Sequence, residues 1–307
     1  MRKFAFDVVV SRLQRTNIQT SIRYVTRRRR RTASRTALAL LPRRWAHLQH
    51  LENLALSVAR DGHVAVLEID RPPHNHVSVE LMRDLADALQ DLDGENDCRA
   101  VVLATAGRVF CGGADLTAPT GIGGQGMEGI NPLYVEAVRL FSNTKTIVAA
   151  VQGAAVGAGL GLALVADFRV VAPEARFTAN FVKLGFHAGF GISHTLPRLI
   201  GLQRAALMLE TGRRIPGEQA LAWGLADELA PLDEVRAAAV RLAKEVAENA
   251  PLAVQSTRAT LRAGLAEAVR SMTDHEFIEQ SRLRKTADYK EGVRAVAERR
   301  PGNFVGA

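Results

Sequence analysis

The middle of the chain contains the stretch TIVAAVQGAAVGAG at positions 146–159, which decides the fold. Its first six residues are β-branched or apolar and predict a buried strand, and the glycines that follow predict a tight turn before a helix. A second stretch, VVLATAGRVFCGGADL at positions 101–116, repeats this order of apolar strand, small residues and turn. We therefore expect two strand-to-helix junctions whose small residues allow a close approach to the backbone.

The backbone N–H groups at these junctions could take part in binding or catalysis. N–H groups at the start of a helix have no partner within the helix and favour negative charge. Two such groups aimed at one carbonyl oxygen would form an oxyanion hole. Tight packing of backbone on backbone, with no ligand between, is the alternative that the spacing leaves open.

The rest of the chain predicts an α/β fold. Residues 54–70 read as a β-hairpin around the turn signal Asp61-Gly62, and the apolar spacing from Val79 indicates an amphipathic helix. Strands are also expected at 100–104, 146–151, 167–171 and 175–178, with a helix at 132–142 and mostly helix after Leu202. Strands that alternate with helices indicate α/β layering, here followed by a helical region.

Two glycine-rich stretches invite other interpretations. Residues 146–166 are nearly uncharged and long enough to span a membrane, but four glycines and Gln152 interrupt any continuous helix. We expect a buried strand, a turn and a buried helix there, and no membrane span. Residues 121–126 match a dinucleotide-binding pattern, yet no strand precedes them, so a loop is expected.

The charge is unevenly distributed. The formal net charge is +8, yet residues 1–50 hold 13 Lys and Arg against one acid, a net charge of +12, so residues 51–307 carry −4. A mildly acidic body does not favour nucleic acid as a partner. Aromatic residues are 5% of the chain, too few for a base-stacking platform, and two cysteines cannot form a disulfide framework.

Residues 1–50 are expected to form a basic, disordered extension. Five adjacent arginines at 27–31 repel one another and leave no apolar face. The extension could be a dispensable tail, an Arg-rich leader for an organelle, or a tail that binds nucleic acid or anionic lipid. A cytoplasmic location is expected, or a mitochondrial one if the extension is a transit peptide.

The chain resembles the enoyl-CoA hydratase/isomerase (crotonase) family over residues 53–307. The matching segments are Arg71-Pro72 followed by Asn75, and positions 110–116, 152–159, 166–170, 211–215 and 291–293. The resemblance implies a crotonase-like spiral of repeated ββα units at 51–250 and a C-terminal helical region at 251–307 that forms trimers or hexamers. It also implies an acyl-CoA thioester as the ligand, so that CoA enters as part of the substrate and no separate cofactor is needed.

The resemblance also implies roles for single residues. The two oxyanion-hole N–H groups would belong to Ala114 and Ala158. The CoA moiety would be held by the backbone of the first motif and by one basic side chain: Cys111, Gly112, Gly113 and Arg299. For Arg299, an exposed surface charge is an equally good interpretation.

The departures from the family pattern concern the acid/base groups. Hydratases of this family use two glutamates, whose positions here fall on Gly161 and Phe181, and neither residue can transfer a proton. His187 could serve as a base, but helix capping or packing beside a glycine turn is the interpretation that we favour for it. Cys111 lacks a paired histidine and is expected to be a small buried side chain. No set of residues shows the spacing of metal ligands.

Two functions stay open after this comparison. The chain is expected to be an acyl-CoA enzyme, a lyase or an isomerase, that stabilises a thioester enolate with reduced acid/base equipment. Alternatively, it is a non-catalytic acyl-CoA-binding or partner subunit that kept the pocket and lost the chemistry. The acyl group cannot be named, because loops such as 116–129 build its pocket.

Overall fold

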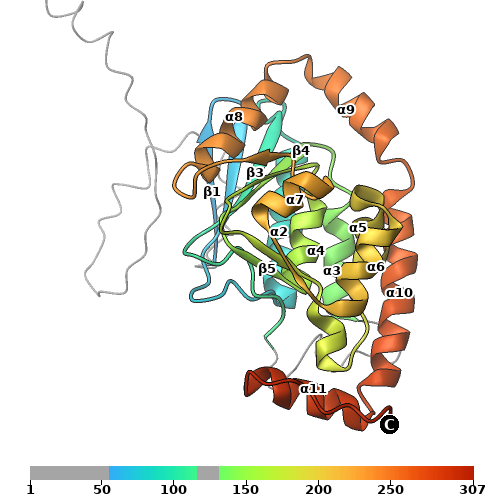
Figure 1. Cartoon of the computed structure of the whole chain (residues 1–307). Helices are drawn as coiled ribbons and strands as arrows, with labels where there is room; N and C mark the ends of the chain where they lie inside the picture. The colour runs from blue at the N-terminus through green and yellow to red at the C-terminus, as the bar shows by residue number, and fades with distance from the viewer. Residues whose placement is uncertain (1–54, 116–130) are drawn as a thin grey trace, which may run out of the picture.

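Two β-sheets organise the computed structural model, which describes residues 55–115 and 131–307 (Figure 1). The strands are β1 (Leu56–Asp61), β2 (Val64–Ile69), β3 (Ala100–Thr105), β4 (Thr146–Val151), β5 (Ala154–Val156), β6 (Phe168–Val171), β7 (Arg176–Thr178), β8 (Arg214–Pro216) and β9 (Glu228–Leu229). The larger sheet has the order β1-β2-β3-β4-β6-β9, with β1 antiparallel to β2 and the other pairs parallel. The smaller sheet has the order β5-β7-β8.

Helices follow most of these strands. They are α2 (Val79–Asp93), α3 (Pro132–Leu140), α4 (Ala158–Val165), the 3-10 helix η3 (Asn180–Leu184), α5 (Ile192–Ile200), α6 (Leu202–Thr211), α7 (Gly217–Trp223), α8 (Val235–Ala247), α9 (Pro251–Leu261), α10 (Leu265–Leu283) and α11 (Ala287–Ala297). The long α10 runs along one side of the body, and α11 lies at its lower end (Figure 1).

The chain winds as a spiral in which the turns that begin with β4 and β6 each add one strand to each sheet. β4 in the larger sheet leads into β5 in the smaller one and then into α4, and β6 leads into β7 and η3 in the same way. After β3, Cys111 bridges to Ala155 of β5 and so takes the equivalent place in the second layer. The predicted α/β spiral of ββα units is confirmed.

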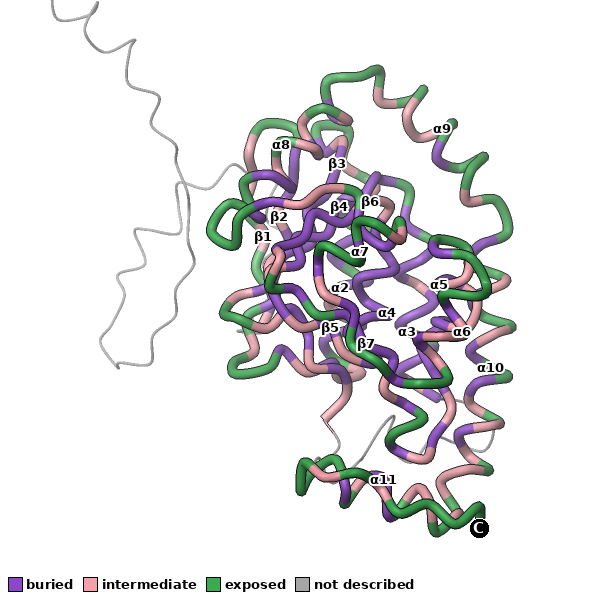
Figure 2. Tube along the Cα trace, in the orientation of Figure 1, coloured by how far each residue is buried: buried purple, intermediate pink, exposed green. Residues whose placement is uncertain are grey.

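The larger sheet is covered on both faces, as expected for buried parallel strands. Val102 of β3 and Val148 of β4 pack under α8, where Ala238 and Ala243 allow the helix to approach closely. Residues that alternate with these along the strands, such as Val101 and Ile147, belong to the larger core on the opposite face. The strands of this sheet are mostly buried (Figure 2). The junctions after β3 and β4 are therefore supported from two sides.

Most predicted elements are present, with small shifts. The hairpin forms, but Asp61 pairs with Val64, so the two-residue loop is Gly62-His63 rather than Asp61-Gly62. The stretch 146–166 is strand, turn and helix, as predicted, with the added short strand β5. Of the described helices, none is long and apolar enough to cross a membrane. The glycine-rich stretch 121–126 and the extension 1–50 lie outside the described residues.

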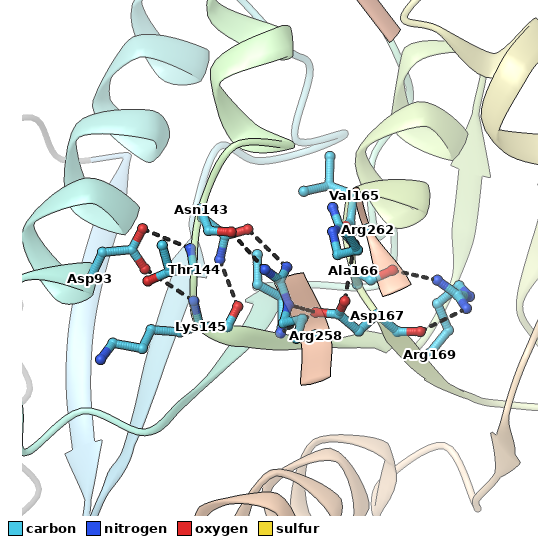
Figure 3. A network of polar contacts seen from close by, with 11 residues as sticks. Asp93, Asn143, Thr144, Lys145, Val165, Ala166, Asp167, Arg169, Arg258 and Arg262 are labelled. Carbon is cyan, nitrogen blue, oxygen red and sulfur yellow. Dashed lines mark hydrogen bonds and ion pairs between the residues drawn. The ribbon is translucent and has the colours of Figure 1, made fainter. Parts of the chain in front are cut away.

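The C-terminal region is joined to the body through buried polar contacts (Figure 3). Asp167 follows α4 and accepts from Arg258 Nε at 2.9 Å and from Arg262 Nη1 at 3.0 Å, which links α9 to the large sheet. Leu265 and Val269 on α10 are buried within the chain itself.

Candidate active site

A cavity lies between the two glycine-rich junctions and η3. Its lining is mostly apolar and backbone, which is usual for ligand sites. The lining residues are Gly112, Gly113, Ala114, Leu133, Tyr134, Val156, Gly157, Ala158, Asn180, Phe181, Leu184, Gly189 and Phe190. The structure thus brings together Ala114 and Ala158, which lie 44 positions apart in the sequence.

The first junction is held by backbone hydrogen bonds on both sides. Cys111 N–H donates to Ala154 O at 2.9 Å, and Cys111 O accepts from Val156 N–H at 2.9 Å. On the other side, Gly113 O accepts from Val77 N–H at 3.0 Å. The peptide that carries the Ala114 N–H is therefore fixed by its neighbours rather than by its own loop.

The second junction turns sharply into α4. Gly157 has a φ of +53°, a left-handed conformation that favours glycine, and it directly precedes Ala158, the first residue of the helix. The N–H of a first helical residue has no acceptor within the helix. Gly157 O accepts from Gly161 N–H at 3.1 Å, which begins the helical ladder.

The two junctions touch so closely that a side chain would not fit between them. A β-carbon on Gly113 would come 2.6 Å from Val156 O, and one on Gly159 would come 2.2 Å from Cys111 O. The same Gly113 position lies 3.6 Å from Ala158 N. The glycines therefore do pack backbone on backbone, and this packing brings Ala114 and Ala158 into the lining of one cavity.

Apolar side chains surround Gly161 and Phe181, the two positions where the family resemblance leads us to expect glutamates. A β-carbon on Gly161 would lie 2.5 Å from Cδ1 of Phe190, so the aromatic ring fills the space that a longer side chain would need. Phe190 is fully buried and has a φ of +65°, an uncommon conformation for a bulky residue. Phe181 lines the cavity at the other position.

Tyr134 is a polar lining residue that the sequence analysis missed. Its hydroxyl donates to Gln280 Oε1 at 2.8 Å, and Gln280 Nε2 donates to the backbone oxygens of His187 and Ala188 at 3.0 and 3.1 Å. Burial raises the pKa of the Tyr134 phenol, so the group stays protonated at neutral pH. Gly189 leaves room for this hydroxyl, since a β-carbon there would lie 1.9 Å from it.

The other residues predicted from the sequence, Cys111, His187 and Arg299, do not line the cavity. Cys111 is fully buried, as expected, and burial raises the pKa of its thiol to about 12, so it is no thiolate nucleophile. The His187 ring faces His275 at 5.9 Å, its Nδ1 lies 2.8 Å from Ala188 O, and it does not line the described cavity. Arg299 is exposed and has a φ of +56°. Positions 116–129, expected to shape the acyl pocket, lie outside the described residues.

Asn75 is the structural counterpart of a matched family segment. It has a φ of +50°, and its side chain accepts from Arg71 N–H at 2.8 Å and donates to Ala106 O and Val109 O at 2.9 and 2.8 Å. These bonds hold the segment before α2 against the loop that leads to the first junction. Across the described ranges 55–115 and 131–307, no cluster of His, Cys, Asp or Glu could hold a metal ion.

Comparison with known proteins agrees with this architecture. A family model described as enoyl-CoA hydratase/isomerase matches residues 59–307. "Probable enoyl-CoA hydratase EchA14" of Mycobacterium tuberculosis is 38% identical over 225 residues, which cover 73% of this chain and 87% of that protein. "Probable enoyl-CoA hydratase" of Rhodobacter capsulatus is 33% identical over 254 residues, 79% of this chain and 95% of that protein.

Solved structures show the same likeness. The crystal structure of carnitinyl-CoA hydratase from Mycobacterium avium superposes with a TM-score of 0.73 at 32% identity, over 82% of this chain and 99% of that one. An enoyl-CoA hydratase/isomerase from Pseudoalteromonas atlantica gives 0.73 at 28% identity, over 82% and 100%. Because the family model spans most of the chain and these relatives align over nearly their whole length, the chain belongs to the enoyl-CoA hydratase/isomerase family.

Proposed function

We propose that the protein is an acyl-CoA enzyme that holds a thioester oxygen between the N–H groups of Ala114 and Ala158. The observation that supports this most directly is that both residues line one cavity: Ala158 begins α4, and Ala114 closely follows the bridge between Cys111 and Ala155. In the described part of the chain, neither N–H donates a hydrogen bond to another protein group. Two preorganised donors at one point stabilise the negative charge that a thioester oxygen gains when an enolate forms.

The CoA moiety enters as part of the substrate in this proposal. Gly112 and Gly113 form the cavity wall next to Ala114, and the buried Cys111 directly precedes them. Arg299, exposed just after α11, supplies a positive charge for a phosphate. The mostly apolar lining suits an acyl chain, and Tyr134 is a polar group within it.

Acid/base chemistry is reduced at this site. No carboxylate or imidazole belongs to the lining among the described residues, and the Phe190 ring lies against Gly161. General acid/base groups typically contribute about 10²–10⁴-fold to a rate. We therefore expect poor hydration of crotonyl-CoA, while isomerisation, decarboxylation and thioester hydrolysis stay candidates, since each uses an oxyanion hole.

A non-catalytic role is the second candidate. The packing of Phe190 on Gly161 closes the space where a catalytic carboxylate would stand, and this favours a subunit that binds acyl-CoA without turning it over. The two candidates differ in one measurable property. An enzyme turns over at least one acyl-CoA thioester, whereas a binding subunit only retains it.

The test uses the full-length protein and one matched pair of variants. Calorimetry measures binding of butyryl-CoA, and product analysis follows crotonyl-CoA, 3-enoyl-CoA, malonyl-CoA and butyryl-CoA. Ala158→Pro removes the proposed donor at the first position of a helix, where proline is tolerated. Leu202→Pro is the control, because Leu202 also follows a glycine, begins α6 and is exposed.

The outcomes separate the candidates. Turnover that falls about 10²–10³-fold in Ala158→Pro and not in Leu202→Pro supports the oxyanion hole. Binding without turnover of any thioester establishes the binding subunit. Absence of binding to any of these thioesters overturns both proposals.

A further inference from the structure

His76 lies directly behind the first junction, and its ring contacts the backbone there. Its Nδ1 is 3.0 Å from Gly113 O. Because a carbonyl oxygen only accepts hydrogen bonds, Nδ1 carries the hydrogen and donates it. Gly112 has no side chain to displace the ring, since a β-carbon there would lie 3.1 Å from His76 Cε1. The imidazole therefore packs on the turn and donates into it.

The segment around His76 is held firmly. Arg71 Nη1 donates to His76 O at 2.9 Å and to Ser78 Oγ at 3.0 Å. Gly112 N–H donates to His74 O at 2.8 Å, so the segment also accepts from the turn. The half-buried His76 ring meets the His74 ring edge-on, with centroids 5.4 Å apart. This frame fixes where the Nδ1 hydrogen points.

The oxygen that accepts the hydrogen bond from His76 belongs to the same peptide group as the Ala114 N–H. Gly113 O and Ala114 N–H are the two ends of one peptide group, and Gly113 O accepts from both His76 Nδ1 and Val77 N–H. Hydrogen bonds to a peptide oxygen polarise the amide and strengthen its N–H as a donor, by about 10–30% per bond. The corresponding peptide of Ala158 obtains this effect from the first turn of α4, where Gly157 O accepts from Gly161 N–H.

We propose that His76 is a positioning residue that orients and polarises the Gly113–Ala114 peptide, and so strengthens the Ala114 N–H toward a thioester oxygen. The inference rests on the proposed oxyanion hole and adds a side chain that acts through it. Because the charge on the thioester oxygen develops in the transition state, the contribution should affect kcat more than KM. If the bond from His76 supplies about 10–30% of the transition-state stabilisation that one oxyanion-hole donor provides, its loss lowers kcat about two- to eight-fold.

Three variants of the full-length protein isolate this contribution. His76→Leu removes the donor and keeps an apolar side chain of similar reach. His76→Asn places an amide N–H near the former Nδ1 and should restore the bond. His63→Leu is the matched control, because His63 Nδ1 makes the same kind of contact, 3.0 Å from Asp97 O, on the β1–β2 hairpin.

The readout is the infrared carbonyl stretch of bound butyryl-CoA labelled with ¹³C at the thioester carbon. Hydrogen bonds to the carbonyl oxygen move this band to lower frequency, whether or not the ligand is turned over. We expect a smaller displacement in His76→Leu, recovery in His76→Asn and no change in His63→Leu. Where a turnover is found, kcat should fall two- to eight-fold in His76→Leu with KM and the melting temperature preserved.

The failures are distinguishable. If the band of butyryl-CoA bound to the unaltered protein is not displaced, the oxyanion hole itself is refuted, and this inference falls with it. If the band is displaced equally in the unaltered protein and in His76→Leu, only the role of His76 is refuted. A loss that His76→Asn does not restore, or that His63→Leu reproduces, also refutes it.

Discussion

At the scale of single residues, the candidate site depends on glycines that pack directly against a backbone carbonyl oxygen or an aromatic ring. Glycines at positions 113 and 159 admit the carbonyl oxygens of the opposite junction, and Gly161 admits the ring of Phe190. Such contacts leave no freedom for a β-carbon. The chemistry expected here uses backbone N–H groups, so these glycines serve function by permitting geometry rather than by reacting.

Introducing a glutamate at position 161 should therefore destabilise the protein. In Gly161→Glu the new side chain must displace the buried Phe190 ring, and overpacking of this kind costs about 1–3 kcal/mol. The double variant Gly161→Glu/Phe190→Gly should unfold at a higher temperature than Gly161→Glu, because glycine removes the ring and accepts the φ of +65°. Thermal unfolding checks this, with Gly94→Glu as a control at an exposed position, where a β-carbon would lie 3.4 Å from Asp91 O in ordinary contact. Equal stability of Gly161→Glu and the unaltered protein would show that the ring yields freely.

At the scale of elements, α9 depends on one carboxylate. Asp167 lies between Arg258 and Arg262, and it also accepts from Ile147 N–H at 2.8 Å (Figure 3). Arg258 further donates to Asn143 O at 2.6 Å. The carboxylate thus joins β4 and the end of α4 to the start of the C-terminal region.

Asp167→Asn should destabilise the fold by about 3–5 kcal/mol, since it leaves two buried guanidinium groups without their counter-charge. Urea unfolding measures this free energy. The control is Asp87→Asn, which breaks an ion pair with Arg139 on the surface and should cost at most about 1 kcal/mol. Similar losses in the two variants would show that burial of the Asp167 cluster adds nothing.

The contact of α10 with α5 should make stability depend on pH. Glu276 on α10 is fully buried and accepts from Gly191 N–H at 2.7 Å and Ser193 N–H at 3.1 Å. Burial raises the pKa of this carboxyl above 4.5, against the effect of these bonds. Between 4.5 and the raised pKa, the folded state binds more protons than the unfolded state. The contribution of Glu276 to the free energy of unfolding therefore falls as the pH rises through that window.

Urea unfolding at a series of pH values should reveal this slope as a difference between variants. Glu276→Gln cannot titrate, so the fall in stability above pH 4.5 should be reduced in it. Glu279→Gln on the same helix is the contrast, because a hydrogen bond from Arg282 lowers the pKa of Glu279 and gives a slope of opposite sign below 4.5. Identical pH profiles for Glu276→Gln and the unaltered protein would contradict the prediction.

At the scale of the whole molecule, several of the most exposed large apolar side chains among the described residues lie on the C-terminal helices. Leu252 and Leu261 on α9 are 78% and 73% exposed, and Ile278 on α10 is 65% exposed. In Figure 2 most of α9 is exposed or intermediate, while Arg258 alone on that helix is buried. Large exposed apolar side chains on one region indicate a contact surface.

We expect this region to join three copies of the chain. Light scattering at micromolar concentration should give the mass of a trimer or a multiple of it, and Leu252→Glu/Leu261→Glu should give a monomer, because a charge at a packed interface is costly. Leu202→Glu is the control, as Leu202 on α6 is 76% exposed outside this region. A monomeric unaltered protein would refute the prediction.

Much of the fold and part of the site follow from local sequence. Helix α2 was predicted from its apolar spacing, and β3 and β4 from short apolar runs, because these patterns repeat with the period of the element itself. The junction motifs around Ala114 and Ala158 were also readable, since small residues and left-handed glycines are needed within a few positions of each other.

Contacts between distant residues were decided only by the tertiary structure. Tyr134 and Gln280 are 146 positions apart, Gly191 and Glu276 are 85 apart, and His76 and Gly113 are 37 apart. No periodic pattern links such residues, because their side chains meet only after the spiral has closed and the C-terminal helices have packed on it. The sequence by itself determined the two glycine-rich motifs and the residues Gly161 and Phe181, whereas packing decided that the ring of Phe190 fills the space beside Gly161.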